Sequence, residues 1–297
     1  MNPGKTLSLL FNRLRRGRIT FHQLGNSGRL GNQLFQYAAV RCLAHRTKRR
    51  LILPPAQEHR LNAFRITAPC SPVRGEPRVS NAFQERQFHF DETFFQSPPN
   101  CDFNGYFQSE RYFAEIADQI RKEFTLVDGE ITHRARQQVE RVRTRHGGRP
   151  VVALHNRRGD MVPTQHERVI SKHRGTFRPD QARYHPLLSS EYIQSAMARF
   201  EGCCFLIFSD SEEDRVWCRE HLGRQGTTVS EGNDDLTDFE MQRLCDHNII
   251  ANSTYSWWAA WLNPHHARQV IAPKRWFGDV YAHYILDDLI PPGWIRL

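Results

Sequence analysis

The segment His-Asn-Arg-Arg-Gly-Asp at residues 155–160 concentrates side chains that can do chemistry. It directly follows Val151–Leu154, an apolar run that predicts a strand. On a strand, His155 and Arg157 share one face and Arg158 points to the other. Because arginine presents a planar fork of donors that matches phosphate oxygens, the pair suits a diphosphate. An isolated Arg-Arg-Gly-Asp is otherwise a solvated turn.

Two further strand ends carry groups that suit a nucleotide ligand. Asp210 follows the predicted strand Cys203–Phe208, and an acidic residue in that place commonly accepts hydrogen bonds from a ribose or a base. The hydroxyls of Ser253, Thr254 and Ser256 lie at the start of a predicted helix. They either help to bind an anion there or serve only as helix caps.

A glycine-rich turn, Gly25–Gly31, lies between a predicted strand, Ile19–Leu24, and a predicted helix, Asn32–Arg46. It is not a Gly-x-Gly-x-x-Gly motif and lacks the Lys-Ser/Thr of a P-loop. Taken alone, it either touches a phosphate or only turns the chain.

The second half of the chain alternates short apolar runs with amphipathic ones. The predicted strands are Val151–His155, Cys203–Phe208, Asn248–Ala251 and Val270–Ala272, and the predicted helices are Ser190–Phe200, Glu212–Leu222, Asp235–Cys245 and Thr254–Leu262. This α/β alternation indicates a parallel sheet covered on both faces. Such sheets bind ligands at the carboxyl ends of their strands, where the groups above lie.

The first half is less regular. Leu51–Leu53 predicts a short strand and Glu110–Phe124 a helix, whereas the region up to Cys101 has no clear period. The polar, arginine-rich stretch Thr132–Arg149 contains two glycines near its end and predicts a domain boundary.

Composition excludes several classes of protein. The chain has 297 residues, of which 39% are hydrophobic and 25% charged, which excludes a mainly disordered or fibrous protein. No apolar run approaches the roughly 18 residues that a bilayer span needs. The net charge of +9 fits nucleic acid, an anionic membrane or a phosphate-bearing substrate. Because the arginines form no basic stripe with aromatic residues, we do not expect nucleic acid.

Two features bear on the compartment. Met1–Phe21 lacks the arrangement of a signal peptide, and the seven cysteines form no Cys-x-x-Cys pair. We therefore expect a cytoplasmic chain with reduced cysteines. Leu9–Arg18 mixes apolar and basic residues, so it is either a short interfacial helix on an anionic membrane or a frayed basic tail.

Several segments together resemble one family. Gly28–Ala38 (GRLGNQLFQYA) resembles the opening motif of the α-1,2-fucosyltransferases, glycosyltransferase family 11. Residues 155–160 match the His-x-Arg-Arg-Gly-Asp motif that these enzymes share with α-1,6- and protein O-fucosyltransferases. Phe208–Asp210 and Ile250–Trp261 resemble their second and third motifs, and Gly105–Phe113 a further signature. The resemblance extends from about residue 19 to the end of the chain, in the family's order.

The resemblance implies a GT-B fold, in which two Rossmann-like domains face each other across the cleft that holds the active site. It also implies GDP-fucose as donor, inversion at the anomeric carbon and no metal. We place an N-terminal, acceptor-side domain at 1–148 and a GDP-fucose-binding domain at 149–297, with a last helix that could pack back on the first domain. No Asp-x-Asp or His-Glu-x-x-His motif occurs, so arginine would take the part of a metal ion.

Carried over by motif, the resemblance assigns roles to individual residues. Arg157 would bind the β-phosphate and stabilise the departing GDP, Arg158 would support the loop or the phosphate, and Asp210 would contact the guanosine. The full expected donor site is Gly31, Asn32, His155, Arg157, Arg158, Asp210, Ser253, Thr254 and Ser256.

The acceptor hydroxyl also needs a general base. Asp160 is the first candidate and Glu167 the second, although Asp160 could instead orient the two arginines. The chain departs from the family pattern here, with Arg-Gly-Asp-Met-Val in place of Arg-Gly-Asp-Tyr-Val. The long polar segment Pro163–His185 follows and is either an acceptor-binding lid or a solvated loop.

We expect the acceptor to be a galactoside, fucosylated at O-2. It would be a galactose-terminated glycan or a lipid-linked oligosaccharide of surface-polysaccharide synthesis, at the inner face of a bacterial membrane. The alternatives are a fucosyltransferase of the same scaffold with another linkage or acceptor, and an inactive relative that only binds the GDP-sugar.

Overall fold

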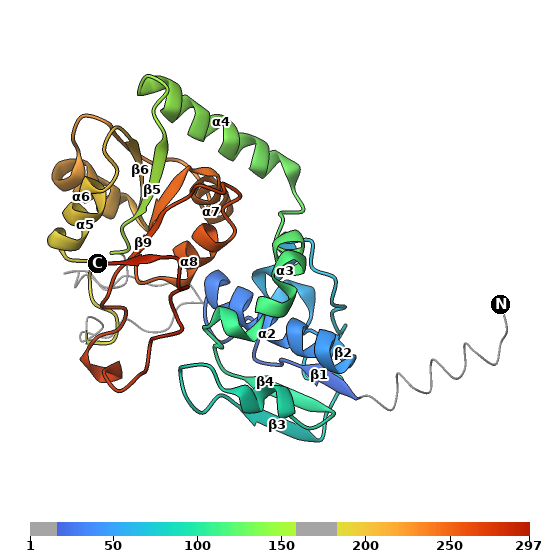
Figure 1. Ribbon diagram of the computed structural model, residues 1–297. Helices are drawn as coiled ribbons and strands as arrows, with labels where there is room; N and C mark the ends of the chain where they lie inside the picture. Colours follow the sequence, from blue (N-terminus) through green and yellow to red (C-terminus); the bar gives the residue numbers. More distant parts are fainter. Residues whose placement is uncertain (1–16, 159–182) are drawn as a thin grey trace. The chain divides into compact units, whose positions relative to one another are not determined.

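The computed structural model describes residues 17–158 and 183–297, which divide into two compact units (Figure 1). Unit 1 comprises the chain up to Val127 together with Tyr284–Pro291. Unit 2 comprises Asp128–His283 together with Pro292–Leu297. Each unit contains one parallel β-sheet, so the expected α/β class is confirmed.

The sheet of unit 1 has four parallel strands in the order β2-β1-β4-β3. They are β1 (Arg18–Thr20), β2 (Arg50–Ile52), β3 (Asn81–Gln84) and β4 (Cys101–Asn104). The predicted strand Ile19–Leu24 is therefore shorter than expected, because the chain turns at Phe21 and the Gln23 carbonyl accepts the amides of Asn26 and Ser27. Strand β3 lies in the region where the sequence has no clear period, and β4 begins where that region ends.

Helix α2 (Leu30–Thr47) confirms the helix expected after the glycine turn. Most of its residues are buried, because it lies in the core of unit 1. By contrast, the helix expected at Glu110–Phe124 is broken. Two 3-10 turns, Glu110–Tyr112 and Ala114–Ile116, precede the short helix α3 (Ala117–Glu123), as Tyr112 and Phe113 turn into the aromatic core. Other 3-10 turns occupy Ala56–Glu58, Arg60–Ala63, Glu92–Gln96 and Asp279–Tyr281.

The sheet of unit 2 has six parallel strands in the order β10-β9-β8-β5-β6-β7. They are β5 (Val151–His155), β6 (Cys204–Phe208), β7 (Thr227–Val229), β8 (His247–Ile249), β9 (Val270–Ala272) and β10 (Ile295–Arg296). Numbered from β5, this is the order 6-5-4-1-2-3 of dinucleotide-binding sheets, and the direction of strand succession reverses between β5 and β8. The edge strands β7 and β10 were not predicted; β7 is only half-buried, and β10 has two residues.

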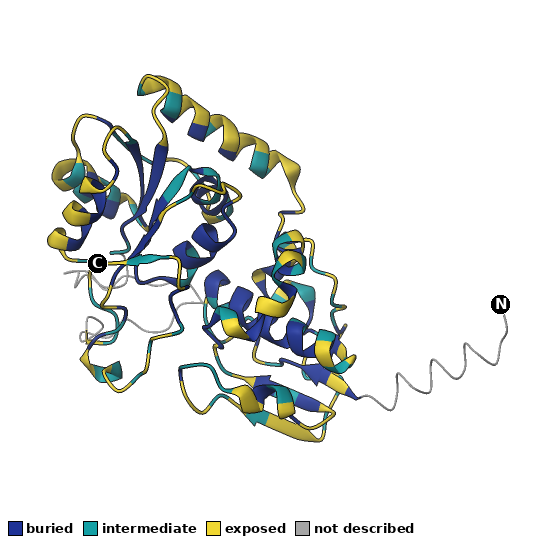
Figure 2. Cartoon of the chain, viewed as in Figure 1, coloured by how far each residue is buried: buried dark blue, intermediate teal, exposed yellow. Residues whose placement is uncertain are grey.

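Helices cover both faces of this sheet. They are α4 (Gly129–Arg145), α5 (Ser190–Ala198), α6 (Glu212–Leu222), α7 (Asp235–Leu244) and α8 (Thr254–Trp261). Alternate residues of β5 divide between two core clusters: Val152 and Leu154 pack with α5 and α6, whereas Val151 and Ala153 pack with α4 and α7. Figure 2 shows β5 and β6 buried between the helices.

Helix α4 corrects the interpretation of Thr132–Arg149 as a boundary segment. Asp128 caps its N-terminus, and Ala135, Val139 and Val142 form a narrow buried stripe against α7. The rest of α4 is polar and arginine-rich, which hid this stripe from the sequence analysis. In the described part of the chain, no helix is both long and apolar enough to cross a membrane.

Candidate functional site

The reversal between β5 and β8 brings three predicted segments of unit 2 to neighbouring strand ends. Leu154 of β5 is the register partner of Ile249 of β8, and His155 is the partner of Phe208 of β6. The residues that follow these strands therefore lie side by side at the carboxyl edge. Ligands of such sheets bind at this edge, beside the point of reversal.

Asn156 holds the end of β5 to its neighbours. Its amide donates to the Phe208 carbonyl at 2.9 Å, and its own carbonyl accepts the hydroxyl of Ser209 at 2.7 Å. Its side-chain amide lies 3.3 Å from the Sγ of Cys218 on α6. These bonds extend the pairing of β5 and β6 beyond the strands, so the arginines that follow start from a fixed backbone.

His155 is buried at this edge, with its ring centroid 5.8 Å from that of Tyr255 on α8. Burial lowers the pKa of His155 to about 4; the charge of Arg157 adds to this effect and Asp210 opposes it. The ring is therefore neutral near pH 7. Its Nδ1 is shielded and has no hydrogen-bond partner within the described ranges.

Arg157 and Asp210 bring opposite charges close to this ring. Arg157 is half-buried, whereas Asp210 is exposed. The arrangement places one cation and one carboxylate at the carboxyl edge around a neutral histidine. It can bind a ligand that has both an anionic group and hydroxyl groups.

Arg158, three residues beyond the end of β5, packs on α6. Its guanidinium lies 3.8 Å from the ring centroid of Trp217, and its Nε lies 3.7 Å from Asp214 Oδ1. Asp214 and Trp217, both on α6, were missed by the sequence analysis. Glu212, Glu213 and Asp214 occupy the first turn of α6 together, and nothing in the sequence marks the third carboxylate as the buried one.

The N-terminus of α8 differs from its neighbours. Side chains of Ser189, Ser211 and Asp234 cap α5, α6 and α7, but Ser253 makes no such bond to α8. Ser253 and Ser256 are buried, Thr254 is half-buried, and Ser256 Oγ donates to the Ser253 carbonyl at 3.3 Å. An anion at this helix end would therefore meet backbone amides more than hydroxyls.

In unit 1, Gly31 and Asn32 lie in the first turn of α2. The side-chain amides of Gln33 and Gln36 bind backbone carbonyls. Gln33 Nε2 donates to the Gly28 carbonyl, and Gln36 Nε2 donates to the carbonyls of Ser27 and Gly105, at 3.0–3.1 Å. The glutamines of the motif therefore fix the glycine turn.

Asn32 and Gly28 pack against each other. Gly28 has φ +93°, and a Cβ there would lie 2.2 Å from Asn32 Nδ2. Asn32 Oδ1 accepts a hydrogen bond from Gln108 Nε2 at 3.0 Å. The opening motif is thereby joined to the signature around Gly105–Phe113.

Glu85 binds the backbone of the Gly105–Phe113 signature, and the sequence analysis did not identify it. Its carboxylate accepts the amides of Tyr106 at 2.7 Å and Phe107 at 2.8 Å. Burial raises the pKa of Glu85 to about 7, against the lowering effect of the two amides. A lone glutamate after an unpredicted strand gives no sequence signal for this role.

Some predicted residues cannot be placed. Asp160 and Glu167 lie outside the described residues, as do Leu9–Arg16 and most of Pro163–His185. Tyr184 and His185, at the end of that segment, pack on Tyr281 and Phe277, with ring centroids 5.5 Å apart in each pair.

Comparison with known proteins identifies the family. Glycosyl transferase family 11 matches residues 8–297. A galactoside alpha-(1,2)-fucosyltransferase 1 of Leontocebus fuscicollis is 32% identical over 254 residues, which are 79% of this chain and 63% of that protein. An alpha-1,2-colitosyltransferase of Escherichia coli is 28% identical over 207 residues, 67% of this chain and 63% of that one. The chain thus spans 63% of the length of these curated relatives.

Solved structures with a similar chain course include the fucosyltransferase NodZ from Bradyrhizobium and POFUT1 in complex with GDP. NodZ is 14% identical with a TM-score of 0.48, over 84% of this chain and 93% of that chain. POFUT1 is 15% identical with a TM-score of 0.47, over 86% and 97%. The family match over residues 8–297 is the stronger finding: the chain belongs to glycosyltransferase family 11.

Proposed function

We propose that the protein transfers L-fucose from GDP-fucose to O-2 of a galactoside, with inversion and without a metal ion. The observation that carries the proposal is the His-Asn-Arg-Arg segment at the end of β5, next to the uncapped α8 that follows β8, in a family 11 chain. The names of the primate and bacterial relatives support an α-1,2 linkage.

In this proposal the diphosphate lies at the N-terminus of α8. Backbone amides there and the guanidinium of Arg157 would bind its oxygens. Asp210, exposed at the end of β6, would accept hydrogen bonds from the nucleoside. Arg158 contacts Trp217 and Asp214 and would support the loop. Gly31 and Asn32, in unit 1, stay a prediction from the sequence resemblance.

Arg157 would carry much of the catalysis. As the bond between fucose C1 and the phosphate oxygen breaks, negative charge grows on GDP and the sugar becomes oxocarbenium-like. A fixed guanidinium stabilises that charge more in the transition state than in the ground state. His155, neutral because of its low pKa, would orient polar groups without adding charge.

Asp160 and Glu167 are the proposed bases for the acceptor hydroxyl. Comparing Asp160→Asn with Glu167→Gln separates them, because loss of the base lowers kcat and removes the acidic limb of the kcat profile. A residue that only orients the arginines would lower kcat without removing that limb. If neither variant changes the limb, both assignments fail.

The test of the function is GDP release from GDP-fucose in EDTA, with a panel of β-galactosides as acceptors. We expect acceptor-dependent release by the wild type and a loss of about 10²–10³ in kcat for Arg157→Ala. Arg141→Ala, at an exposed position of α4, is the matched control and should keep full activity.

Each other outcome identifies an alternative. Release only with added metal would refute the metal-independent mechanism. GDP binding without release would indicate another acceptor or an inactive relative, whereas no GDP binding would refute the proposal. A GDP-linked colitose donor belongs in the same assay because the bacterial relative is a colitosyltransferase. Faster transfer of colitose than of fucose would identify colitose as the donor sugar.

Location and membrane contact stay predictions from the sequence. Cytoplasmic location and contact of Leu9–Arg18 with anionic lipid depend on a segment of which residues 9–16 lie outside the described ranges. The galactose-terminated or lipid-linked acceptor is likewise a prediction from the sequence.

A further inference from the structure

The Gly105–Phe113 signature has no role in the proposed function, although it follows β4 at the carboxyl edge of the unit 1 sheet. Among residues 17–158 and 183–297, Tyr106 is the one aromatic residue that is exposed, at 42%. The three residues that follow it are buried. A single exposed ring needs no explanation by itself, so its importance depends on how the backbone around it is held.

The backbone on both sides of Tyr106 has conformations that side chains rarely adopt. Gly105 has φ +153°, and a Cβ there would lie 2.4 Å from the Cβ of Glu85. Phe107 has φ +52°, which is unfavourable for a bulky residue. Its ring is buried, with its centroid 5.0 Å from that of Phe94. Backbone strain of this kind persists only where the surrounding structure imposes it, and it concentrates at functional sites.

Hydrogen bonds hold both peptide groups that flank Tyr106. One carboxylate oxygen of Glu85 accepts the amide of Tyr106 at 2.7 Å, and the other accepts the amide of Phe107 at 2.8 Å. The carbonyl of Gly105 accepts Gln36 Nε2 at 3.0 Å. The position of the exposed ring is therefore fixed before a ligand arrives, which lowers the entropy lost on binding.

The neighbouring groups select the chemistry of that ligand. Asn104 and Gln84, the last residues of β4 and β3, are exposed, and Asn104 Nδ2 donates to Gln84 Oε1 at 2.8 Å. Side-chain amides have donors and acceptors, which suit hydroxyl groups. The face of an aromatic ring is apolar and carries partial negative charge, which suits C–H groups. A neutral pyranose presents both hydroxyls and a C–H face.

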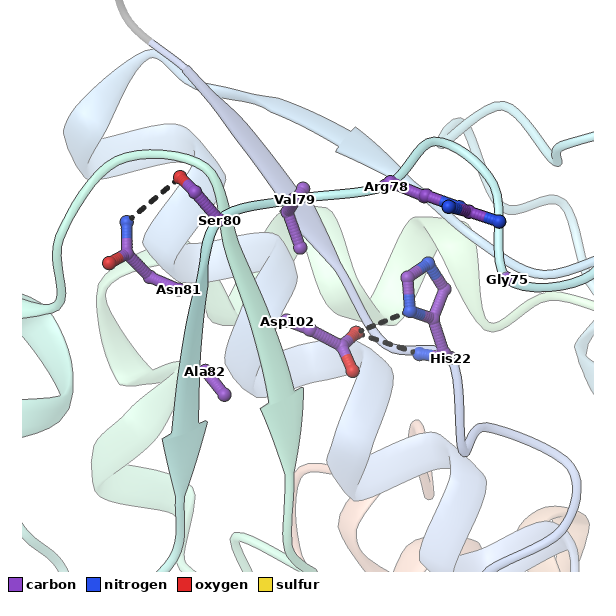
Figure 3. Close-up of a pocket in the computed structure, with 8 residues that line it drawn as sticks. All are labelled: His22, Gly75, Arg78, Val79, Ser80, Asn81, Ala82 and Asp102. Carbon is purple, nitrogen blue, oxygen red and sulfur yellow. Dashed lines mark hydrogen bonds and ion pairs between the residues drawn. The ribbon is translucent and has the colours of Figure 1, made fainter.

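Unit 1 also has a depression, lined by His22, Gly75, Asp102 and residues 78–82 (Figure 3). Its carboxylate is already bonded within the unit, because Asp102 Oδ1 accepts the amide of His22 at 2.9 Å and the hydroxyl of Thr20 at 2.8 Å. Among the described residues, no tyrosine, tryptophan or phenylalanine lines it. It therefore offers a sugar no ring on which to stack.

We propose that the exposed ring of Tyr106 binds a sugar residue of the acceptor by stacking on its C–H face, and that Glu85 positions this ring. The inference rests on the proposed function, since a fucosyltransferase acts on an acceptor glycan. It adds Tyr106 to that function as an acceptor-binding residue and Glu85 as a positioning residue.

The direct test is binding of methyl β-D-galactopyranoside, lactose and N-acetyllactosamine to the full chain by saturation-transfer NMR, with and without GDP. We expect a sugar signal from the wild type and from Tyr106→Phe, and none from Tyr106→Ala, with GDP affinity unchanged. Val73→Ala, at another exposed apolar side chain of unit 1, is the matched control and should keep the signal. Ala82→Trp fills the depression and should keep it too.

Transfer kinetics provide the second readout. Tyr106→Ala should raise the acceptor KM about tenfold and leave the KM for GDP-fucose unchanged, because the ring contacts only the acceptor. A wild-type acceptor KM in Tyr106→Ala overturns the contact, as does an equal rise in Tyr106→Phe, which would assign it to the hydroxyl. Loss of the sugar signal in Ala82→Trp but not in Tyr106→Ala would place the sugar in the depression instead.

Two outcomes separate this contact from the proposed function. Sugar binding that Tyr106→Ala abolishes, in a chain that transfers nothing, supports the contact and refutes the proposed function. A wild type that neither binds nor fucosylates any of the three galactosides overturns the contact.

Glu85→Gln tests the positioning role. A glutamine turns an NH₂ group toward one of the two backbone amides, so one of the two hydrogen bonds is lost. We expect the acceptor KM of Glu85→Gln to rise, and the double variant with Tyr106→Ala to have the KM of Tyr106→Ala alone. Additive effects in the double variant would show that Glu85 does not act through Tyr106 and would overturn that role.

Discussion

His155 and Arg158 show how one strand end divides its side chains between two tasks. His155 faces Tyr255 and becomes neutral, because burial there disfavours the imidazolium. Arg158, on the other face, lies against Asp214 and the ring of Trp217, both on α6. The two faces of this strand end therefore differ: one carries a neutral histidine, and the other carries an arginine held against α6.

The low pKa of His155 makes stability depend on pH. The unfolded chain takes up a proton near pH 6.5, whereas the folded chain does so only near 4, so stability falls as pH drops through this window. From pH 7 to pH 4 the wild type should lose about 3 kcal/mol more unfolding free energy than His155→Gln. Urea unfolding at the two pH values measures the difference; equal losses would show that His155 is not buried as a neutral ring.

Among the elements, helix α2 owes its position to polar side chains as much as to its apolar core. Gln33 and Gln36 bond backbone carbonyls of two glycine-containing turns, and Asn32 lies against Gly28. Asn32 leaves no room for a side chain at residue 28.

Gly28→Ala should lower the unfolding free energy by about 2 kcal/mol or more. The new Cβ would meet Asn32 at a backbone φ of +93°, which adds a collision to the conformational strain. Gly202→Ala is the matched control, because Gly202 has φ +77° and nothing within 4 Å. Chemical denaturation compares the two; equal effects would mean that strain alone, without the collision, accounts for the loss.

Glu85 predicts a pH effect of opposite sign. Because its folded pKa of about 7 lies above the ordinary value of 4.5, stability falls as pH rises through that interval. The Tm of Glu85→Gln, relative to the wild type, should therefore rise between pH 5 and pH 8. Glu201→Gln, at an exposed position, is the control variant. A constant difference for Glu85→Gln would refute the raised pKa.

The sequence predicted those elements whose residues repeat a pattern over a full strand or helix. Strand β5 and helix α6 have the predicted bounds; β5 is a short apolar run that is buried throughout. Prediction failed where packing between residues far apart in the sequence determines the local structure. Tyr112 and Phe113 break a helical pattern to enter the aromatic core, and Ala135, Val139 and Val142 are too sparse among arginines to mark α4.

The same reasoning separates the candidate site residues whose position could be predicted from the contact residues that were missed. Residues adjacent to a strand end, such as Arg157 and Asp210, could be located because the parallel sheet determines where its strands end. Asp214, Trp217 and Glu85 act on motif residues from other elements. Their roles depend on distances across the fold, which spacing in the chain does not contain.

At the scale of the whole molecule, the chain enters unit 1 twice. Tyr284–Pro291 belongs to unit 1, where Leu289 and Ile290 are buried and Tyr284 stacks on Phe88 with ring centroids 5.1 Å apart. Asp288 Oδ2 accepts the amide of Phe90 at 2.7 Å. The chain then returns to unit 2 and ends in β10.

Asp288→Ala should loosen this second entry without unfolding unit 2. Hydrogen exchange should accelerate in the peptides that contain Phe90 and Tyr284 and stay unchanged in β5 and β6. Asp279→Ala, an exposed carboxylate in unit 2 paired with Arg275, serves as the control. Unchanged exchange at Phe90 would show that the Asp288 bond does not hold the segment.

The second entry of the chain makes this a protein that can be split and reassembled. A break between Val127 and Asp128 would yield two polypeptides that are each incomplete, because the second carries eight residues of the first one's core. Co-expressed halves would therefore recognise each other through Tyr284–Pro291, as in fragment complementation. The proposed transferase activity would return only in cells that produce both halves.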